Sequence, residues 1–390
     1  MGTATCIMLV AAEPSGDALG AGLMRALRRR LGEGVRFVGV GGPLMTAEGL
    51  DSPFDIAELS ILGWFEGARA YRKVVARADE TAALAAREKP DAAVLIDSWG
   101  FTMRVAQRLR RQDPSLKLIK YVGPQVWASR PGRAKILAAT FDHLLSILAF
   151  DAPWFEKEGL PVTPVGNPTL AKDFSKADPD WLRQQIGAAP ADQILLVLPG
   201  SRKSEISRLM SPFGDAVARL KKDRPRLHVA LALADSIADD ARAAAEAWPV
   251  LPYLVQGEAA RIDAMRGATL ALACSGTVTT EVALAGCPMV VAYRMSPISW
   301  FLVKRFVTTA YVCLVNIAAG REIAPELLQD KCTGPLLAAA LAKRLDDEDL
   351  RLHQIAEQDA ALEKMGPKGG PDPSERAADA VIAILEGRAP

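Results

Sequence analysis

Short apolar runs alternate with amphipathic helical patterns along most of this chain, and this alternation limits the fold more than any other feature. In the first half the runs cover residues 5–12, 36–40, 92–96, 116–122 and 143–148. After Asp192 they recur at residues 194–198, 228–233, 268–274 and 289–293. Short apolar runs of this kind, of which residues 5–12 carry no charge, suit strands that are buried on both faces of a parallel sheet. The sequence therefore predicts an α/β fold with two doubly wound, Rossmann-like halves.

A length of 390 residues is enough for two domains that each bury a full core. We expect a first domain over residues 1–166, a linker over 167–190, a second domain over 191–365 and a C-terminal helix within 366–390 that can return to the first domain. Ligands of doubly wound domains bind at the carboxyl ends of the strands. We therefore expect the two domains to face each other across a cleft that contains the chemistry.

The composition excludes several classes of function. Lys and Arg total 47 against 46 Asp and Glu, so no overall field favours nucleic acid. The five cysteines lie mostly in apolar runs, without a C-x-x-C pair or clustered histidines, which predicts buried reduced thiols and no metal site. The N-terminus lacks the pattern of a signal peptide, and charges interrupt every long apolar stretch. We expect a cytoplasmic protein without a membrane span.

The first predicted turn from strand to helix has the sequence EPSG, residues 13–16. The start of the following helix offers unpaired backbone N–H groups to a ligand. In the plainer alternative Ser15 or Asp17 caps the helix and Gly16 only permits the bend. The glycines here do not follow the G-x-G-x-x-G spacing, so a nicotinamide cofactor is not indicated.

A second such turn, LPGSR at residues 198–202, is predicted to bind an anion. Backbone N–H groups at the helix start would meet phosphate oxygens, Gly200 would permit close approach, and Arg202 would add a bidentate donor. The alternative is a solvated arginine beside a capped helix.

The loop SGTVTTE, residues 275–281, repeats this design with Ser275, Gly276 and Thr277 at a helix start. The carboxylate of Glu281 suits ribose hydroxyls. In the alternative, Glu281 is an acid that complements the helix dipole.

Asp97 ends the apolar strand 92–96 and is the candidate general base. A role as helix N-cap fits the neighbouring Ser98 better, with a helix that begins near Thr102. The chain has only three histidines, in apolar strands or a polar helical tail, so a carboxylate base is favoured. Such a base accepts the proton of an attacking hydroxyl as a phosphorylated group leaves, which is group transfer and not redox chemistry.

Seven blocks in order resemble the lipid-A-disaccharide synthase family of inverting GT-B glycosyltransferases, over nearly the whole chain. They are AEPSGD (12–17), FVGVGGPLM (37–45), the strand end 96–97, YVGPQVWASR (121–130), LPGSR (198–202), SGTVTTE (275–281) and the long match 293–322. The resemblance implies transfer of 2,3-diacylglucosamine from UDP to the 6-hydroxyl of 2,3-diacylglucosamine 1-phosphate. The product is the β-1,6 disaccharide, and no metal or other cofactor is required.

The resemblance also implies roles for individual residues. Asp97 would be the base, Glu13 would touch substrate in the active-site floor, and Arg202 would hold the diphosphate and stabilise departing UDP. Asn316 would donate to sugar or phosphate, although an ordinary capping asparagine is the alternative. The substrate-binding set implied in this way comprises Ser15, Gly16, Gly200, Ser201, Arg202, Glu205, Ser275, Gly276, Thr277, Glu281 and Arg321.

Two positions depart from the family pattern. Asn167 stands where histidine is usual and Asp151 where glutamate is usual. An amide exchanges no proton near neutral pH, so we assign no titration chemistry to residue 167.

The segment 59–79 joins an apolar group to basic residues at near-helical spacing. These residues are Ile61, Leu62, Trp64, Phe65, Arg69, Arg72 and Lys73. Because both implied substrates carry acyl chains, we expect this segment to face the cytoplasmic surface of the inner membrane. The alternative is a core helix with a solvated basic face.

Two other functions remain open from the sequence. One is another UDP-sugar enzyme of the same fold, such as a UDP-N-acetylglucosamine 2-epimerase. The other is a non-catalytic peripheral protein that binds nucleotide or lipid. The apolar residues of 298–315 suit a homodimer contact as well as a core.

Overall fold

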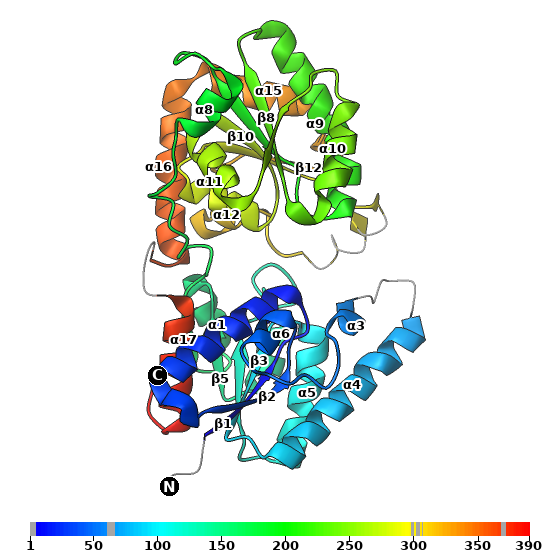
Figure 1. Ribbon diagram of the computed structural model, residues 1–390, viewed down its shortest axis with the longest axis vertical. Coiled ribbons are helices and arrows are strands. Elements are labelled where there is room, and N and C mark those ends of the chain that lie inside the picture. The colour runs from blue at the N-terminus through cyan, green and yellow to red at the C-terminus, as the bar shows by residue number, and fades with distance from the viewer. Residues whose placement is uncertain (1–4, 61–66, 298–299, 302–304, 306, 368–371) are drawn as a thin grey trace. The chain divides into compact units, whose positions relative to one another are not determined.

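A computed structural model of the chain describes residues 5–60, 67–297, 300–301, 305, 307–367 and 372–390. The chain divides into two compact units (Figure 1). The first contains Met1–Pro168 and Gly370–Pro390, and the second contains Thr169–Gly369.

The first unit is built on a six-stranded parallel sheet in the order β2-β1-β3-β4-β5-β6. Its strands are β1 Cys6–Val10, β2 Arg36–Val40, β3 Ala92–Ile96, β4 Lys117–Tyr121, β5 His143–Ser146 and β6 Val162–Pro164. Its α-helices are α1 Pro14–Leu31, α2 Pro43–Ala47, α3 Ala57–Ser60, α4 Gly67–Glu88, α5 Trp99–Gln112, α6 Arg133–Ala138, α7 Ala152–Glu156 and α17 Pro373–Leu385.

The second unit repeats this plan with a parallel sheet in the order β12-β11-β10-β7-β8-β9. Its strands are β7 Ile194–Leu198, β8 His228–Leu233, β9 Tyr253–Gln256, β10 Leu270–Cys274, β11 Met289–Tyr293 and β12 Glu326–Leu328. Its described α-helices are α8 Trp181–Ile186, α9 Lys203–Asp223, α10 Ala238–Glu246, α11 Glu258–Gly267, α12 Thr277–Leu284, α14 Leu314–Ala319, α15 Gly334–Asp346 and α16 Glu348–Met365.

The central strands confirm the predicted α/β class, because β1, β3, β7 and β10 are buried along their whole length, as an apolar run requires. Helices cover both faces of each sheet and complete two Rossmann-like layers. The five cysteines are free and buried, in agreement with the sequence. Within the described residues, no helix is long and apolar enough to cross a membrane.

The boundary between the units differs from the expected linker over residues 167–190. Residues from Thr169 onward belong to the second unit, where α8 packs against α11. The C-terminal helix α17 belongs to the first unit and packs beside α1, red against blue in Figure 1. Arg30 of α1 forms ion pairs with Glu375 and Asp379 of α17, at 2.7 and 2.8 Å.

Asp17 connects the first helix to the loop after β2. Its buried carboxylate accepts backbone hydrogen bonds from Gly42, Leu44 and Met45, at 2.8, 2.9 and 3.0 Å. The capping alternative for Ser15 or Asp17 is therefore wrong: α1 begins at Pro14, and no side chain caps it. The Asp17 carboxylate instead accepts the backbone N–H groups at the start of α2. It therefore holds the block at residues 12–17 against the block at residues 37–45.

Asp151 fixes the loop that follows β4. Its carboxylate accepts hydrogen bonds from the Trp127 indole at 2.7 Å and the Ser146 hydroxyl at 2.9 Å. Burial raises the pKa of Asp151 to about 6. The Ser146 hydroxyl also lies 2.9 Å from the Leu148 carbonyl, so its one hydrogen cannot serve both acceptors. Below about pH 6 the protonated carboxyl of Asp151 donates to Ser146 instead, which leaves the Ser146 hydrogen for the Leu148 carbonyl.

We predict that Asp151→Asn, which copies the protonated carboxyl, becomes increasingly stable relative to the wild type as the pH rises. The native pKa lies above the unfolded value of about 3.9, so the wild type loses stability between about pH 4 and 6. The difference in unfolding free energy should grow by roughly 3 kcal/mol over this window and stay constant above it. Urea unfolding from pH 4 to 8 measures it.

Asp113→Asn is the control of opposite sign, because hydrogen bonds from Ser115 lower the pKa of Asp113. That variant should lose stability relative to the wild type as the pH rises to about 4, the unfolded value, and should change little above it, so its series starts at about pH 2. A pH-independent difference for Asp151→Asn would show that Asp151 is ionised in the native protein throughout this range.

Candidate active site

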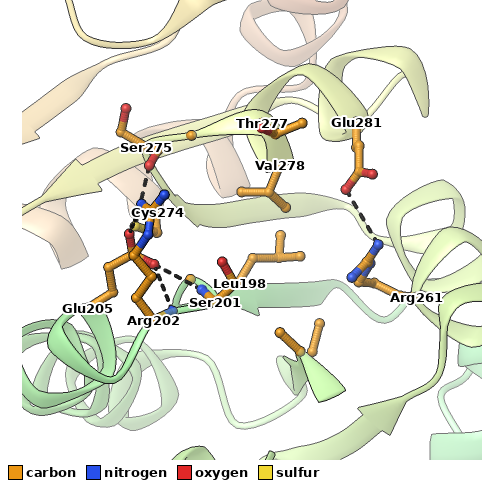
Figure 2. A pocket seen from close by; sticks show the side chains of 14 residues that line it. Leu198, Ser201, Arg202, Glu205, Arg261, Cys274, Ser275, Thr277, Val278 and Glu281 are labelled. Atoms are coloured by element: carbon orange, nitrogen blue, oxygen red, sulfur yellow. Dashed lines mark hydrogen bonds and ion pairs between the residues drawn. The ribbon is translucent and has the colours of Figure 1, made fainter. Parts of the chain in front are cut away.

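The carboxyl ends of β7, β8 and β10 in the second unit surround a cavity of about 260 Å³ (Figure 2). The first turns of α9 and α12 complete its walls. Its lining residues are Leu198, Gly200, Ser201, Arg202, Glu205, Ala232, Ala234, Arg261, Cys274, Ser275, Gly276, Thr277, Val278 and Glu281. The predicted LPGSR and SGTVTTE loops therefore meet in one pocket, as the parallel order of β7 and β10 requires.

The turn after β7 differs from the predicted phosphate loop. The Glu205 carboxylate accepts the backbone N–H groups of Ser201 and Arg202, at 2.9 and 3.2 Å, and pairs with the Arg202 guanidinium at 3.1 Å. The expectation that these two N–H groups meet phosphate is thus wrong, because Glu205 already occupies them. The Arg202 side chain remains 75% exposed at the pocket, so its other donors can still meet an anion.

The start of α12 has no side-chain cap in this pocket. Its N-cap, Gly276, has no side chain to cap the helix, and Thr277 begins the first turn on the pocket wall. The N–H groups of a first helical turn have no partners within the helix. The Ser275 hydroxyl is not available, since it donates to the Val312 carbonyl at 3.2 Å. The sequence predicted open backbone N–H groups at the helix starts in both the LPGSR and the SGTVTTE loops. In the structure they remain open at the positive end of α12.

Arg261 and Glu281 form the opposite side of the pocket (Figure 2). Their nearest charged atoms are 3.7 Å apart, and Lys172 also contacts Glu281 at 2.7 Å. The Arg261 Nε atom is buried and has no hydrogen-bond partner among the described residues, so a ligand acceptor here would satisfy it. Sequence reasoning missed Arg261, because its helix carries no motif.

Two predicted site residues lie outside this pocket and have structural partners. The Asn316 amide donates to Ala324 O at 2.7 Å and to Glu326 at 2.8 Å, and its oxygen accepts the N–H groups of Ile323 and Ala324. No donor remains for sugar or phosphate, so the predicted catalytic role of Asn316 is wrong and the asparagine is structural. Arg321 forms an ion pair with Glu357 of α16 and does not line the pocket.

In the first unit, Asp97 follows β3 in a strained turn. Asp97 and Ser98 both have left-handed backbone conformations, with φ of 47° and 40°. Helix α5 begins at Trp99, three residues before the expected Thr102, and Ser98 makes no side-chain cap. The partly exposed Asp97 side chain is therefore held by the backbone at the carboxyl edge of the sheet.

The buried side chain of Lys120 hydrogen-bonds to this turn. Lys120 was not identified from the sequence. Its side chain is 1% exposed, and its ammonium group donates to the Asp97 carbonyl and to the Thr102 hydroxyl, the latter at 2.9 Å. Burial lowers the pKa of Lys120 to about 7, and the carboxylates of Asp97 and Glu13 act in the opposite direction. The available signal was a lysine that follows Leu118 and Ile119 inside the strand KLIKY, where the strand's other lysine, Lys117, stands at its exposed first position.

The first turn of α1 presents Glu13 and Ser15 to solvent, whereas Gly16 is buried beside Ala11 and Ile96. Glu13 and Asp97 follow neighbouring strands of the sheet and both act on Lys120. The predicted site residues Glu13 and Asp97 thus lie at the carboxyl ends of adjacent strands. Gly16 allows close packing and offers no surface to a substrate.

Part of the predicted membrane-facing segment can be placed. Ile61, Leu62, Trp64 and Phe65 lie outside the described residues. Arg69, Arg72 and Lys73 belong to α4, and the side chains of Arg72 and Lys73 are exposed. Lys73 pairs with Glu58 at 3.2 Å.

Solved structures share this two-domain fold. The S. aureus MnaA–UDP structure covers 99% of both chains with a TM-score of 0.63 at 14% identity. Acinetobacter baumannii MurG covers 98% of this chain and 99% of its own with a TM-score of 0.57 at 15% identity. Two Rossmann-like domains, one with a pocket at the carboxyl ends of its strands, place the chain in the GT-B fold class.

Sequence comparison gives the family. The family of lipid-A-disaccharide synthetases matches residues 7–376. The lipid-A-disaccharide synthases of Paramagnetospirillum magneticum and Rhodospirillum centenum are 44% and 42% identical to this chain. These matches cover 97% and 98% of this chain, and 97% and 95% of those relatives. The chain belongs to the lipid-A-disaccharide synthase family and is a glycosyltransferase.

We predict that Gly200→Ala releases the turn after β7. Gly200 has a φ of 111°, and a Cβ there would lie 2.2 Å from the Glu205 Oε2 atom. The strain and the clash should remove Glu205 from the two N–H groups and accelerate amide hydrogen exchange at Ser201 and Arg202 by about tenfold or more. Gly34→Ala is the control, since no atom lies near its Cβ position. Unchanged exchange at both amides would contradict the cap.

Proposed function

We propose that this glycosyltransferase moves 2,3-diacylglucosamine from UDP-2,3-diacylglucosamine to the 6-hydroxyl of 2,3-diacylglucosamine 1-phosphate. The observation that carries this proposal is the pocket at the ends of β7 and β10, in a chain whose curated relatives carry the name lipid-A-disaccharide synthase. The products are UDP and the β-1,6-linked disaccharide 1-phosphate.

The donor nucleotide binds in the second unit. Its diphosphate meets the N-terminal turn of α12 and the Arg202 guanidinium, which together supply positive charge. Glu281 accepts a ribose hydroxyl, and the unpartnered Nε atom of Arg261 donates to the nucleoside or the adjacent phosphate. S. aureus MnaA, whose fold is similar, has been solved with UDP.

Asp97 acts as the general base for the acceptor. Its carboxylate takes the proton from the 6-hydroxyl while that oxygen attacks the anomeric carbon of the donor sugar. The bond from the anomeric carbon to the phosphate oxygen breaks on the opposite face, and its electron pair leaves with UDP. Because the hydroxyl attacks the face opposite to the leaving UDP, the anomeric configuration inverts and the linkage is β. The Lys120 contact keeps the Asp97 turn in its strained conformation throughout.

The positive charge that the leaving diphosphate requires comes from Arg202 and from the dipole of α12. We propose on this ground that the transfer proceeds without a metal ion or another cofactor.

We predict that Asp97→Asn lowers turnover by at least about 100-fold, because a positioned base contributes that much or more. The assay incubates the purified chain with both sugars in EDTA and follows UDP and disaccharide by mass spectrometry. The wild type should form both products. Wild-type turnover in Asp97→Asn would remove this residue from the mechanism, and a reaction that needs added Mg²⁺ would refute the metal-free proposal.

The same assay separates the alternatives that the sequence left open. An epimerase would convert UDP-N-acetylglucosamine without an acceptor, and a binding protein would release no UDP.

We predict that Arg202→Ala weakens UDP binding by about tenfold or more and slows transfer, because charge-assisted hydrogen bonds serve both bound donor and leaving group. Titration calorimetry with UDP measures the first effect. Arg219→Ala on the same helix is the control, since Arg219 pairs with Asp215 away from the pocket. Equal UDP affinity for both variants would refute this position for the diphosphate.

We further propose that the first unit docks on the cytoplasmic surface of the inner membrane, where acylated substrates reside. The exposed Tyr71, Arg72 and Lys73 at the start of α4 support this proposal, because an aromatic ring and basic groups suit an anionic headgroup layer.

We predict that Arg72→Glu lowers the affinity for vesicles with anionic lipid by about 30-fold, since each basic residue contributes about 1 kcal/mol and the reversal counts twice. Arg87→Glu, at the other end of the same helix, should have little effect. Sedimentation with anionic and with neutral vesicles gives both affinities. Equal losses for the two variants would show that overall charge, and not this helix end, determines binding.

A further inference from the structure

Lys172 lies beside the pocket of the second unit and pairs with carboxylates of two helices. Its ammonium group donates to Glu281 Oε1 of α12 at 2.7 Å and to Glu258 Oε1 of α11 at 3.0 Å. Glu281 lines the pocket, whereas Lys172 does not. The lysine therefore contacts a residue of the pocket without lining the pocket itself.

The chain around Lys172 is fixed by buried neighbours. Leu170 and Phe174 are buried on either side of the lysine, and the Lys172 N–H donates to the Thr169 carbonyl at 3.3 Å. Burial lowers the pKa of Lys172, but the hydrogen bonds to its two carboxylate partners outweigh this effect and raise the pKa above its usual value. Lys172 is thus a positive charge held in one place.

The two oxygens of the Glu281 carboxylate have different surroundings. Lys172 occupies Oε1, and the Glu281 side chain is 9% exposed. The other oxygen, Oε2, lies 3.7 Å from the Nη2 atom of Arg261, which is too far for a hydrogen bond (Figure 2). Oε2 and the Arg261 guanidinium are thus an acceptor and a donor that one ligand hydroxyl can join, because a hydroxyl both donates and accepts.

We propose that Lys172 is a positioning residue that makes this chain prefer a ribonucleotide donor. This inference rests on the proposed function, in which Glu281 accepts a ribose hydroxyl. By holding Oε1, Lys172 fixes the Glu281 side chain and leaves Oε2 for the ribose. By pairing with Glu258, it also connects the first turn of α11, which leads to Arg261, with α12.

Loss of Lys172 would let Glu281 and Arg261 pair with each other directly. A mostly buried carboxylate that has lost one cation is destabilised, so its free oxygen moves toward the guanidinium that lies 3.7 Å away. Such a direct pair occupies the acceptor and the donor that a ribose hydroxyl would otherwise join. A nucleotide without ribose hydroxyls does not use these groups, so its binding should not depend on Lys172.

The test compares UDP with 2′,3′-dideoxy-UDP by titration calorimetry. The wild type should bind UDP about tenfold or more tightly than the dideoxy nucleotide, as expected for a hydrogen bond to a charged group. Lys172→Met should weaken UDP binding by about tenfold and change dideoxy-UDP binding by less than about threefold. Wild-type affinity for the dideoxy nucleotide also shows that the variant is folded.

Lys176→Met is the matched control, since Lys176 is an exposed lysine of the same segment and does not line the pocket. Equal losses for the two nucleotides in Lys172→Met would overturn the inference, because the lysine would then support only the fold. A wild type that binds both nucleotides equally would overturn it as well. If Lys172→Met does not fold, Lys172→Gln, which removes the charge and keeps a polar side chain, undergoes the same comparison with the same expected pattern.

The transfer assay separates this inference from the proposed function. A chain that prefers UDP through Lys172 but forms no disaccharide would overturn the proposed reaction and leave the role of Lys172 in place. A chain that forms the disaccharide, and whose Lys172→Met variant keeps the wild-type affinity for UDP, would overturn the role of Lys172 alone. Absence of UDP binding in the wild type would overturn both.

Discussion

The parallel pairing of two strands in each unit is the constraint on which both halves of the site depend. In the first unit β1 pairs with β3, so that Glu13 and Asp97 follow adjacent strand ends. In the second unit β7 pairs with β10, so that Arg202 and Gly276 do the same. Because parallel strands end at one edge, residues far apart in sequence meet there without long loops. The register of these central strands therefore determines the chemistry available to each unit.

Buried hydrogen bonds then decide which polar residues near that edge remain free for a ligand. Asp17 and Asn316 belong to blocks that resemble a catalytic family, and Glu205 follows another such block, yet each satisfies backbone N–H groups of a neighbouring turn. A buried N–H group without a partner lowers the stability of the fold. Nearby side-chain oxygens therefore accept these N–H groups and do not bind a ligand. Among the described residues of the pocket in the second unit, the donors left open include the exposed Arg202, the start of α12 and the buried Nε atom of Arg261.

A buried lysine lies beside the candidate base in the first unit. Lys120 is buried beneath Asp97, and its low pKa reflects the cost of keeping an ammonium group out of water. Its hydrogen bond to the Asp97 carbonyl holds a turn whose left-handed conformation would otherwise relax.

The sequence by itself determined the α/β class, the central strands such as β3 and β7, and the two loops that form the pocket. Its signals were strong because fully buried strands must be apolar and because turns between strand and helix need small residues. The short edge strands β6, β9 and β12 were missed, since a three- or four-residue strand at an edge has little periodicity. Only the tertiary structure decided that Lys120 supports Asp97, that Arg261 lines the pocket and that Asn316 does not. Each of these depends on contacts between segments distant in the chain, and local patterns do not encode such contacts.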